Sequence, residues 1–181
     1  MSLAIRLAFW LGLREVRVKG SMALNVWIIM LTLILSTWQL ARADSFEAFG
    51  VDTFAEIKAA RSGQAFLLSL WSIDCAPCRL ELEMLGELKK KDPSFPLVLI
   101  SADSLEQRQT AHYLLEEYFL DGLTSWMFAD NFSERLRYSI DPNWYGELPR
   151  SYLFDTTHVS TAHSGVLTEE QLAAFLSAIS R

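Results

Sequence analysis

The sequence has very few of the residues that build metal centres and disulfide-stapled folds. Its 181 residues include only two cysteines, Cys75 and Cys78. A zinc site on this pair would need two further ligands, and there is no third cysteine. Both cysteines stand in one Cys-x-x-Cys motif, so none remains for a second dithiol or another disulfide in this chain. The three histidines, His112, His158 and His163, are expected at the surface, and no metal or cofactor is predicted.

Positive charge is scarce beyond residue 43. The formal net charge is −6, and residues 1–43 carry +4, which leaves −10 on residues 44–181. The basic cluster in that acidic part is Lys89-Lys90-Lys91, which suits the carboxyl end of a helix. Such a domain is poorly suited to a phosphate backbone, so no nucleic-acid partner is expected. The sequence also lacks internal repeats, low-complexity runs and glycine-rich phosphate loops.

The N-terminal residues have the pattern of an export signal. Residues 1–21 are net basic and would form a cytoplasmic n-region, and residues 22–43 include the uncharged, mostly apolar run 23–40. Eighteen such residues can just span a bilayer. Ala41-Arg42-Ala43 then matches a signal-peptidase site. We expect cleavage near Ala43, with an uncleaved inner-membrane anchor as the alternative. Either way, residues 44–181 form one exported domain in a periplasm-like space that permits disulfides.

A strand-to-helix junction carries the cysteine pair. The apolar run Ala65–Leu70 predicts a buried strand, and apolar residues at 80, 84, 85 and 88 recur at helical spacing. Cys75 therefore lies at a helix N-terminus, where unpaired N–H groups and the helix dipole stabilise a thiolate. Cys78, one turn later, can close a ring with Cys75 and release a bound partner. Pro77 suits the first turn, where a missing N–H costs little.

Strands and helices alternate along the rest of the chain. Further helices are expected at 52–61, 105–120, 132–140 and 167–179, and further strands at 96–101, 125–129 and ending near 165. Asp52 or Thr53 can cap the first of these helices, and Thr168 can cap the last. This order predicts an α/β fold with right-handed crossovers between parallel strands.

Trp71 followed by Cys75-Ala76-Pro77-Cys78 resembles the active-site motif of the thioredoxin superfamily. The resemblance implies a thioredoxin-like α/β fold, with a central mixed sheet flanked by helices. The 71 residues from Cys78 to Pro149 leave room for an inserted strand and helix between the redox helix and that proline.

A second hallmark of the superfamily is matched by Gly146-Glu147-Leu148-Pro149, which feeds an apolar strand. The resemblance implies that Pro149 is cis and lies against the cysteine pair, and that Leu148 offers its backbone to an extended partner segment. The groove for that segment would be shaped by Trp71, Ala76, Pro77, Leu148 and Pro149.

Within the superfamily the chain is similar to exported TlpA-like thiol–disulfide oxidoreductases. Their glutamate three residues after the second cysteine is matched by Glu81, and the resemblance implies that Glu81 exchanges protons with the thiols. An ordinary exposed helix carboxylate is the alternative. Ser69 stands where thioredoxins have a buried aspartate, and Arg150 stands where threonine is common. Asp74, directly before Cys75, should disfavour a neighbouring thiolate.

We therefore predict a thiol–disulfide oxidoreductase that acts on exported proteins, in which Cys75 forms a mixed disulfide and Cys78 resolves it. A reductase is favoured, because TlpA-like proteins are usually reducing and because Asp74 opposes a strongly stabilised thiolate. A membrane thiol relay would supply its electrons. The alternatives are a disulfide-forming oxidant, a disulfide isomerase, and a binding module or copper metallochaperone whose thiolates hold Cu(I) without redox turnover.

Overall fold

A computed structural model describes residues 46–130 and 132–179 of the chain. Every described helix and strand belongs to one compact unit, residues 44–181. Residues 1–21 and 22–43 lie outside the described residues, so the n-region, the apolar run and cleavage near Ala43 stay predictions. Across the described ranges, no helix is both long and apolar enough to cross a membrane.

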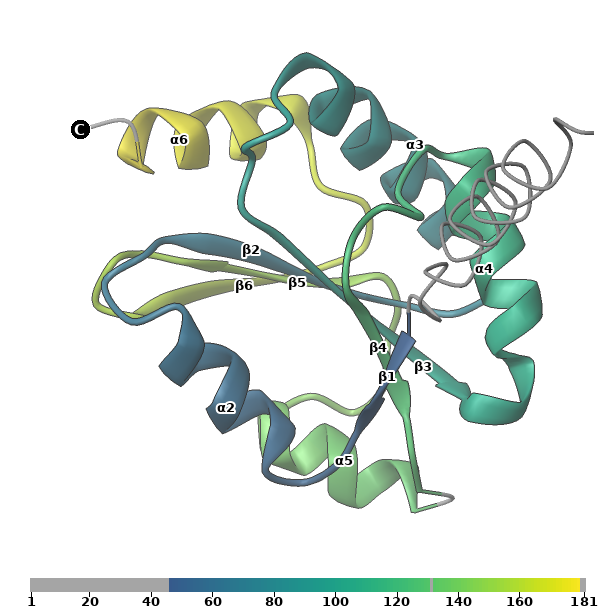
Figure 1. Cartoon of the computed structure of the whole chain (residues 1–181). Coiled ribbons are helices and arrows are strands. Elements are labelled where there is room, and N and C mark those ends of the chain that lie inside the picture. Colours follow the sequence, from purple (N-terminus) through teal and green to yellow (C-terminus); the bar gives the residue numbers. More distant parts are fainter. Residues whose placement is uncertain (1–45, 131, 180–181) are drawn as a thin grey trace, which may run out of the picture. The chain divides into compact units, whose positions relative to one another are not determined.

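Six strands form one mixed sheet in the order β1-β4-β3-β2-β5-β6 (Figure 1). The strands are β1 (Phe46–Phe49), β2 (Phe66–Trp71), β3 (Leu97–Ser104), β4 (Ser125–Phe128), β5 (Arg150–Phe154) and β6 (Ser160–Ser164). Strands β1, β4, β3 and β2 run parallel, whereas β5 is antiparallel to β2 and β6 is antiparallel to β5. All residues of β2 are buried, as expected for a strand covered on both faces. The predicted α/β fold with a central mixed sheet is confirmed.

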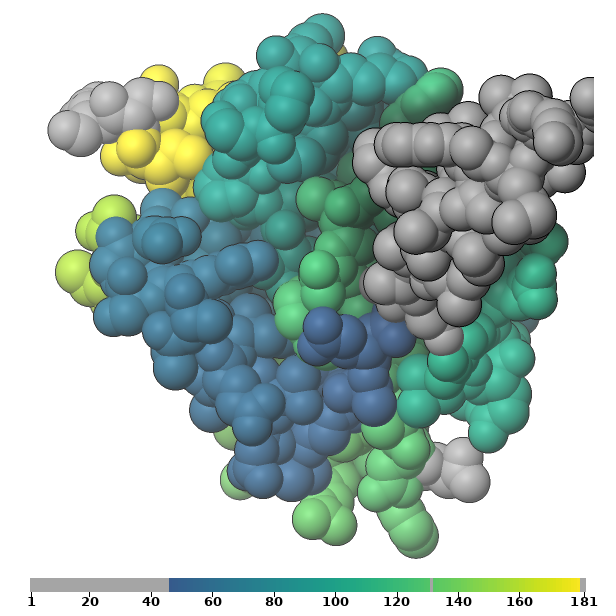
Figure 2. All heavy atoms as spheres, viewed as in Figure 1, coloured from purple at the N-terminus to yellow at the C-terminus, as the bar shows by residue number. Residues whose placement is uncertain are grey.

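Helices cover both faces of this sheet. In the described residues they are α2 (Thr53–Ala60), α3 (Ala76–Lys91), α4 (Arg108–Glu117), α5 (Ser133–Ile140) and α6 (Glu169–Ile179). Helices α3, α4 and α6 pack on one face, and α2 and α5 pack on the other (Figure 1). Helix α6 lies beside α3, as the all-atom view also shows (Figure 2). Side chains of β2 alternate between the two cores: Leu67 and Trp71 face α3, whereas Leu68 and Leu70 face α2.

The predicted room for an inserted strand and helix between the redox helix and the proline is used. Between α3 and Pro149 the chain forms two strand–helix pairs, β3 with α4 and β4 with α5. Strand β4 of the second pair lies between β1 and β3 and so widens the sheet. The sequence does not predict β1, because the four residues Phe46–Phe49 are too few to show a recognisable period. Their pairing with β4 makes them a strand.

A side chain caps the N-terminus of α6 as predicted, whereas none caps α2. Asp52 occupies the N-cap of α2, but its side chain accepts no cap hydrogen bond. The Thr53 hydroxyl instead accepts a hydrogen bond from the Gly50 N–H at 3.0 Å, so the predicted side-chain cap is wrong. At α6 the prediction is confirmed, because the Thr168 hydroxyl accepts a hydrogen bond from the Gln171 N–H at 3.2 Å.

The helix predicted at 105–120 is shorter than expected. It begins as the 3₁₀ turn η2 (Leu105–Gln107), and the α-helical part, α4, ends at Glu117. Phe119 has a φ of 60°, which is left-handed backbone that an α-helix cannot contain. The chain therefore turns away from the helix axis before the predicted end.

Helix α3 buries the apolar side that its spacing predicts, except at Leu80. Leu85 is buried, and Met84 and Leu88 pack against the same core. Leu80 is 60% exposed, whereas the buried residues of the helix are Cys78, Glu81, Leu82, Leu85 and Gly86. Helix α3 also approaches the end of α4 closely, because a Cβ at Gly86 would lie 2.0 Å from the carbonyl oxygen of Tyr118. Glu81 faces inward, where hydrogen-bond donors meet its carboxylate.

Candidate active site

The cysteine pair lies in the turn between β2 and α3. Cys75 occupies the N-cap of α3, and its N–H donates to the Ser72 carbonyl at 3.2 Å, which shapes the turn. Cys75 and Cys78 form a disulfide with an S–S distance of 1.97 Å. Cys75 is half-buried, whereas Cys78 has no exposed surface. A partner molecule can therefore reach Cys75 but not Cys78.

The first turn of α3 favours negative charge on Cys75. The Cys75 Sγ accepts a hydrogen bond from the Cys78 N–H at 3.2 Å, as an N-cap serine or aspartate oxygen does in other helices. Pro77 lies in this turn and has no N–H, so it leaves no donor unsatisfied. The first turn also contains no acidic residue. The N–H groups and dipole of α3 would therefore stabilise a Cys75 thiolate once the disulfide is reduced.

The proline segment lies beside the cysteine turn. The Leu148–Pro149 peptide bond is cis. Arg150 pairs with Leu70 in the antiparallel β2–β5 ladder, so Pro149 adjoins the end of β2 that leads to the cysteines. Leu148 and Cys75 also pack against the same hydrophobic core. The fold thus brings together two segments that are distant in sequence.

The residues predicted to shape a substrate groove differ in exposure. Ala76 and Pro77 are exposed at the start of α3, Leu148 is half-buried and Pro149 is buried. Trp71 has no exposed surface, so the expectation that it forms part of the groove surface is corrected. As the last residue of β2, it points into the core between the sheet and α3 and supports the cysteine turn from below.

Glu81 is buried among hydrogen-bond donors. Its exposed fraction is 1%, which contradicts the alternative of an ordinary exposed helix carboxylate. Oε1 accepts hydrogen bonds from the hydroxyls of Ser69 and Ser151 at 2.7 and 2.6 Å. Oε2 accepts one from the Leu167 N–H at 3.1 Å. This buried polar group is therefore fully hydrogen-bonded, and Ser69 holds the carboxylate of α3 from the neighbouring strand.

The sequence does not single out Asp103, which holds the turn before the cysteines. Asp103 Oδ1 accepts a hydrogen bond from the Ser72 hydroxyl at 2.8 Å, and Oδ2 accepts one from the Ile73 N–H at 2.8 Å. Oδ2 also accepts the Ser101 hydroxyl at 2.7 Å. Asp103 could have been found from its position near the carboxyl end of β3. Parallel β2 and β3 end at the same edge of the sheet, so polar residues there lie near the turn after β2.

The histidines are less exposed than predicted, because His112, His158 and His163 are each half-buried. The His158 ring packs edge-on against Phe66, with 5.4 Å between ring centroids. His163 forms a hydrogen bond with the Gln171 side chain at 3.0 Å. Among residues 46–130 and 132–179, no group of three His, Cys, Asp or Glu side chains is placed to hold a metal ion.

Comparison with solved structures identifies the fold as thioredoxin-like. A secreted Mycobacterium tuberculosis disulfide oxidoreductase homologous to E. coli DsbE is 18% identical, with a TM-score of 0.53 over 66% of this chain and 85% of that one. A thioredoxin-family thiol:disulfide interchange protein from Chlorobium tepidum is 21% identical, with a TM-score of 0.53 over 67% and 83%. M. tuberculosis DsbF is 15% identical, with a TM-score of 0.53 over 66% and 84%. No protein-family model matches the sequence, and no curated protein is significantly similar to it.

Proposed function

We propose that residues 44–181 form a thiol–disulfide oxidoreductase that reduces disulfides in exported proteins. One observation carries the proposal: an accessible Cys75 at the N-cap of α3 is disulfide-bonded to a buried Cys78 one turn later. The helix end can stabilise a thiolate on the accessible sulfur, and the buried sulfur is placed to displace a bound partner. The likeness in fold to proteins described as disulfide oxidoreductases supports this proposal.

In the proposed reaction, the thiolate of reduced Cys75 attacks one sulfur of a substrate disulfide. The substrate S–S bond breaks, its other sulfur leaves as a thiolate that takes up a proton, and a mixed disulfide joins Cys75 to the substrate. The Cys78 thiolate then attacks Cys75 Sγ and re-forms the Cys75–Cys78 disulfide, and the second substrate sulfur leaves as a thiolate that takes up a proton. Two electrons thereby pass from the protein dithiol to the substrate.

We propose that Glu81 accepts the proton that Cys78 loses when it becomes a thiolate. Helix α3 carries both residues on its buried face, with Glu81 one turn after Cys78. Cys78 has no exposed surface, so its proton needs an acceptor inside the protein. The hydroxyls of Ser69 and Ser151 hold the Glu81 carboxylate in position for this transfer.

Charge beside the cysteines supports the reducing direction. Asp74 is exposed and directly precedes Cys75. Its negative charge opposes a Cys75 thiolate, whereas a strong oxidant stabilises its reduced form. Export is supported by the basic and apolar segments of residues 1–43 and by the secreted M. tuberculosis protein of similar fold. Because both cysteines of the chain are in one pair, an outside electron donor would have to reduce it again, and we propose a membrane thiol relay for this step.

The reduction potential of the Cys75–Cys78 pair tests the activity and its direction together. The purified domain, residues 44–181, is titrated against a dithiol couple. We expect a potential near that of thioredoxin, about −270 mV. A value near about −120 mV would make the protein an oxidant instead. A pair that does not cycle, even with a strong reductant, would contradict oxidoreductase activity itself.

A further inference from the structure

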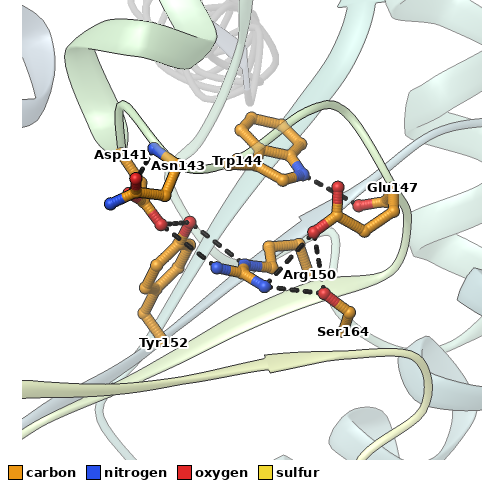
Figure 3. A network of polar contacts seen from close by, with 7 residues as sticks. All are labelled: Asp141, Asn143, Trp144, Glu147, Arg150, Tyr152 and Ser164. Carbon is orange, nitrogen blue, oxygen red and sulfur yellow. Dashed lines mark hydrogen bonds and ion pairs between the residues drawn. The ribbon is translucent and has the colours of Figure 1, made fainter.

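Arg150, the first residue of β5, lies at the centre of a group of polar side chains (Figure 3). Its Nη2 donates to Asp141 Oδ2 at 3.1 Å, and its Nη1 donates to Glu147 Oε1 at 3.2 Å. Nη1 also donates to Ser164 Oγ at 2.6 Å, and Nε donates to Tyr152 Oη at 3.1 Å. These five residues form the Arg150 cluster. The Ser164 hydroxyl in turn donates to Glu147, and the Tyr152 hydroxyl donates to Asp141, each at 2.8 Å.

The Arg150 cluster ties down the loop that carries the cis proline. This loop, residues 141–149, begins at Asp141 directly after α5, and Glu147 lies near its end. Arg150 thus reaches both ends of the loop from one position on the sheet. The other two members of the cluster lie on β5 and β6. Within the loop, the Trp144 indole N–H donates to the Glu147 carbonyl at 2.9 Å, which closes its middle part.

Burial and charge make the guanidinium of Arg150 hard to replace. The exposed fraction of the side chain is 13% for Arg150 and 17% for its partner Asp141. Burial alone would lower the pKa of Arg150, but hydrogen bonds to Tyr152 and Asp141 and the charge of Glu147 raise it above its ordinary value. Without the guanidinium, the two carboxylates that now share it would lose their counter-charge and repel each other. The ends of the loop would then separate.

We propose that Arg150 is a positioning residue for substrate binding. It holds residues 141–149 so that the Leu148 backbone, beside cis Pro149, is ready to pair with an extended segment of a substrate protein. A loop held in its binding geometry loses less conformational entropy on association. The inference rests on the proposed thiol–disulfide exchange, and Arg150 acts on it through the hydrogen bonds of its guanidinium to the Arg150 cluster.

The same loop presents a side chain that suits protein recognition. Tyr145 is 87% exposed, while its neighbour Trp144 is buried and fixes the backbone beside it. Gly146 follows with a φ of 103°, a conformation that favours glycine. An exposed tyrosine on a fixed loop offers a large contact area at a small entropic cost. Arg150 would therefore also hold Tyr145 in place for the substrate.

Two substrates with the same leaving group separate positioning from chemistry. One is an extended cysteine peptide activated as a mixed disulfide with thionitrobenzoate, and the other is the small reagent dithiobis(nitrobenzoate). Release of thionitrobenzoate by the reduced protein is followed against concentration. For Arg150→Met we expect the half-saturating peptide concentration to rise about tenfold, because the loop no longer holds its backbone ready for the peptide. The maximal rate should not change, because Cys75 and Cys78 are unaltered. The rate with the small reagent and the reduction potential should not change.

Two further variants complete the design. Arg150→Lys keeps the charge but loses the planar fork, so it should recover only part of the peptide binding. Arg61→Met is the matched control, since Arg61 is also half-buried but lies over the Phe66 ring at the opposite end of β2 from the cysteines. It should behave as the unmodified protein does. If Arg150→Met does not fold, Glu147→Gln removes one carboxylate charge from the cluster and leaves Arg150 in place.

The outcomes distinguish this inference from the proposed function. An unchanged half-saturating peptide concentration in folded Arg150→Met, or an equal loss with both substrates, would overturn the positioning role. If the unmodified protein reacts with neither substrate, the proposed exchange has failed, and the positioning of substrate fails with it. Amide hydrogen exchange adds a readout that needs no activity. Residues 142–148 should exchange faster in Arg150→Met than in Arg61→Met, and equal rates would contradict the role of Arg150 in holding the loop.

Discussion

Ser151 on β5 donates a 2.6 Å hydrogen bond to Glu81 on α3, although the two residues are 70 positions apart in sequence. The same carboxylate oxygen accepts the Ser69 hydroxyl from β2. One buried carboxylate therefore links the helix that begins at the cysteines to the strand that precedes them and to the strand that follows the cis proline. This link holds the two halves of the candidate active site in one arrangement.

Glu81→Gln should destabilise the domain by about 2 kcal/mol, because a neutral amide is a weaker acceptor than the carboxylate. If its oxygen stays on the Ser69 and Ser151 hydroxyls, its N–H₂ group faces the Leu167 N–H, which cannot accept. Urea unfolding of residues 44–181 at neutral pH measures the change. Glu83→Gln is the control, since Glu83 lies on the exposed face of the same helix and should change stability by less than about 0.5 kcal/mol. Equal effects of the two substitutions would contradict the importance of the buried hydrogen bonds.

Cys78→Ala should trap a mixed disulfide between Cys75 and a substrate, whereas Cys75→Ala should trap none. The reason is exposure: Cys75 is half-buried and Cys78 has no exposed surface. Each variant is incubated with a disulfide-containing protein, and the products are separated by electrophoresis without reductant. A covalent complex formed equally well by Cys75→Ala would reverse the proposed roles of the two sulfurs.

Asp103→Ala should slow mixed-disulfide formation about tenfold, because the Ser72 hydroxyl and the Ile73 N–H lose the acceptor that holds the turn before Cys75. Asp103→Asn keeps one acceptor oxygen, and we expect a smaller loss. The measurement is the rate of complex formation in the Cys78→Ala background. Asp92→Ala, at the exposed far end of α3, is the control and should leave that rate unchanged.

Gly86→Ala should cost about 2 kcal/mol or more of stability, even though alanine favours a helix by about 1 kcal/mol over glycine. A Cβ at this position would lie 2.0 Å from the backbone oxygen of Tyr118, which is far inside contact distance. Gly122→Ala is a matched control, because a Cβ there meets nothing within 4 Å. Thermal unfolding of both variants tests this, and a Gly86→Ala protein as stable as its control would refute the close approach of α3 to α4.

The contribution of Asp141 to stability should depend on pH in the acid range. Burial alone would raise the pKa of Asp141, but hydrogen bonds from Asn143, Tyr152 and Arg150 outweigh it and lower the pKa below its ordinary value. A lowered pKa in the folded state gives stability that is present above the unfolded pKa, about 3.9, and is lost as the pH falls through the folded pKa. The difference in unfolding free energy between the unmodified protein and Asp141→Asn should therefore be constant above about pH 5 and shrink below about pH 4. A difference that already shrinks near about pH 6 would point to another titrating group.

Elements with strong local signals agree with the sequence prediction. Buried strand β2 is a continuous apolar run, and the Pro77 turn begins a helix that ends with Lys89-Lys90-Lys91 before Asp92-Pro93. Helix α6 has its predicted Thr168 cap. These features depend on residues within a few positions of one another, so they are readable without the fold. Strand β1 is the contrary case, because its four residues become a strand only through pairing with β4.

Predictions about side-chain environment were less successful than those about backbone elements. The apolar spacing of α3 groups Leu80 with Met84, Leu85 and Leu88, but only the last three pack against the core and Leu80 is exposed. Trp71 was expected at the groove surface and lies in the core, because the end of β2 is covered by α3. In both cases the environment depends on which neighbouring element comes closest, and periodicity within one segment carries no such information.

Sequence alone specifies the cysteine motif, its place at a strand-to-helix junction and the α/β class, because each follows from residues that are close together in the chain. Tertiary structure decides the surroundings of that motif. The carboxylate of Glu81 receives its donors from residues 12, 70 and 86 positions away. Arg150 likewise reaches Ser164 across the β5–β6 ladder. Burial and hydrogen bonding between such distant residues exist only once the sheet has formed.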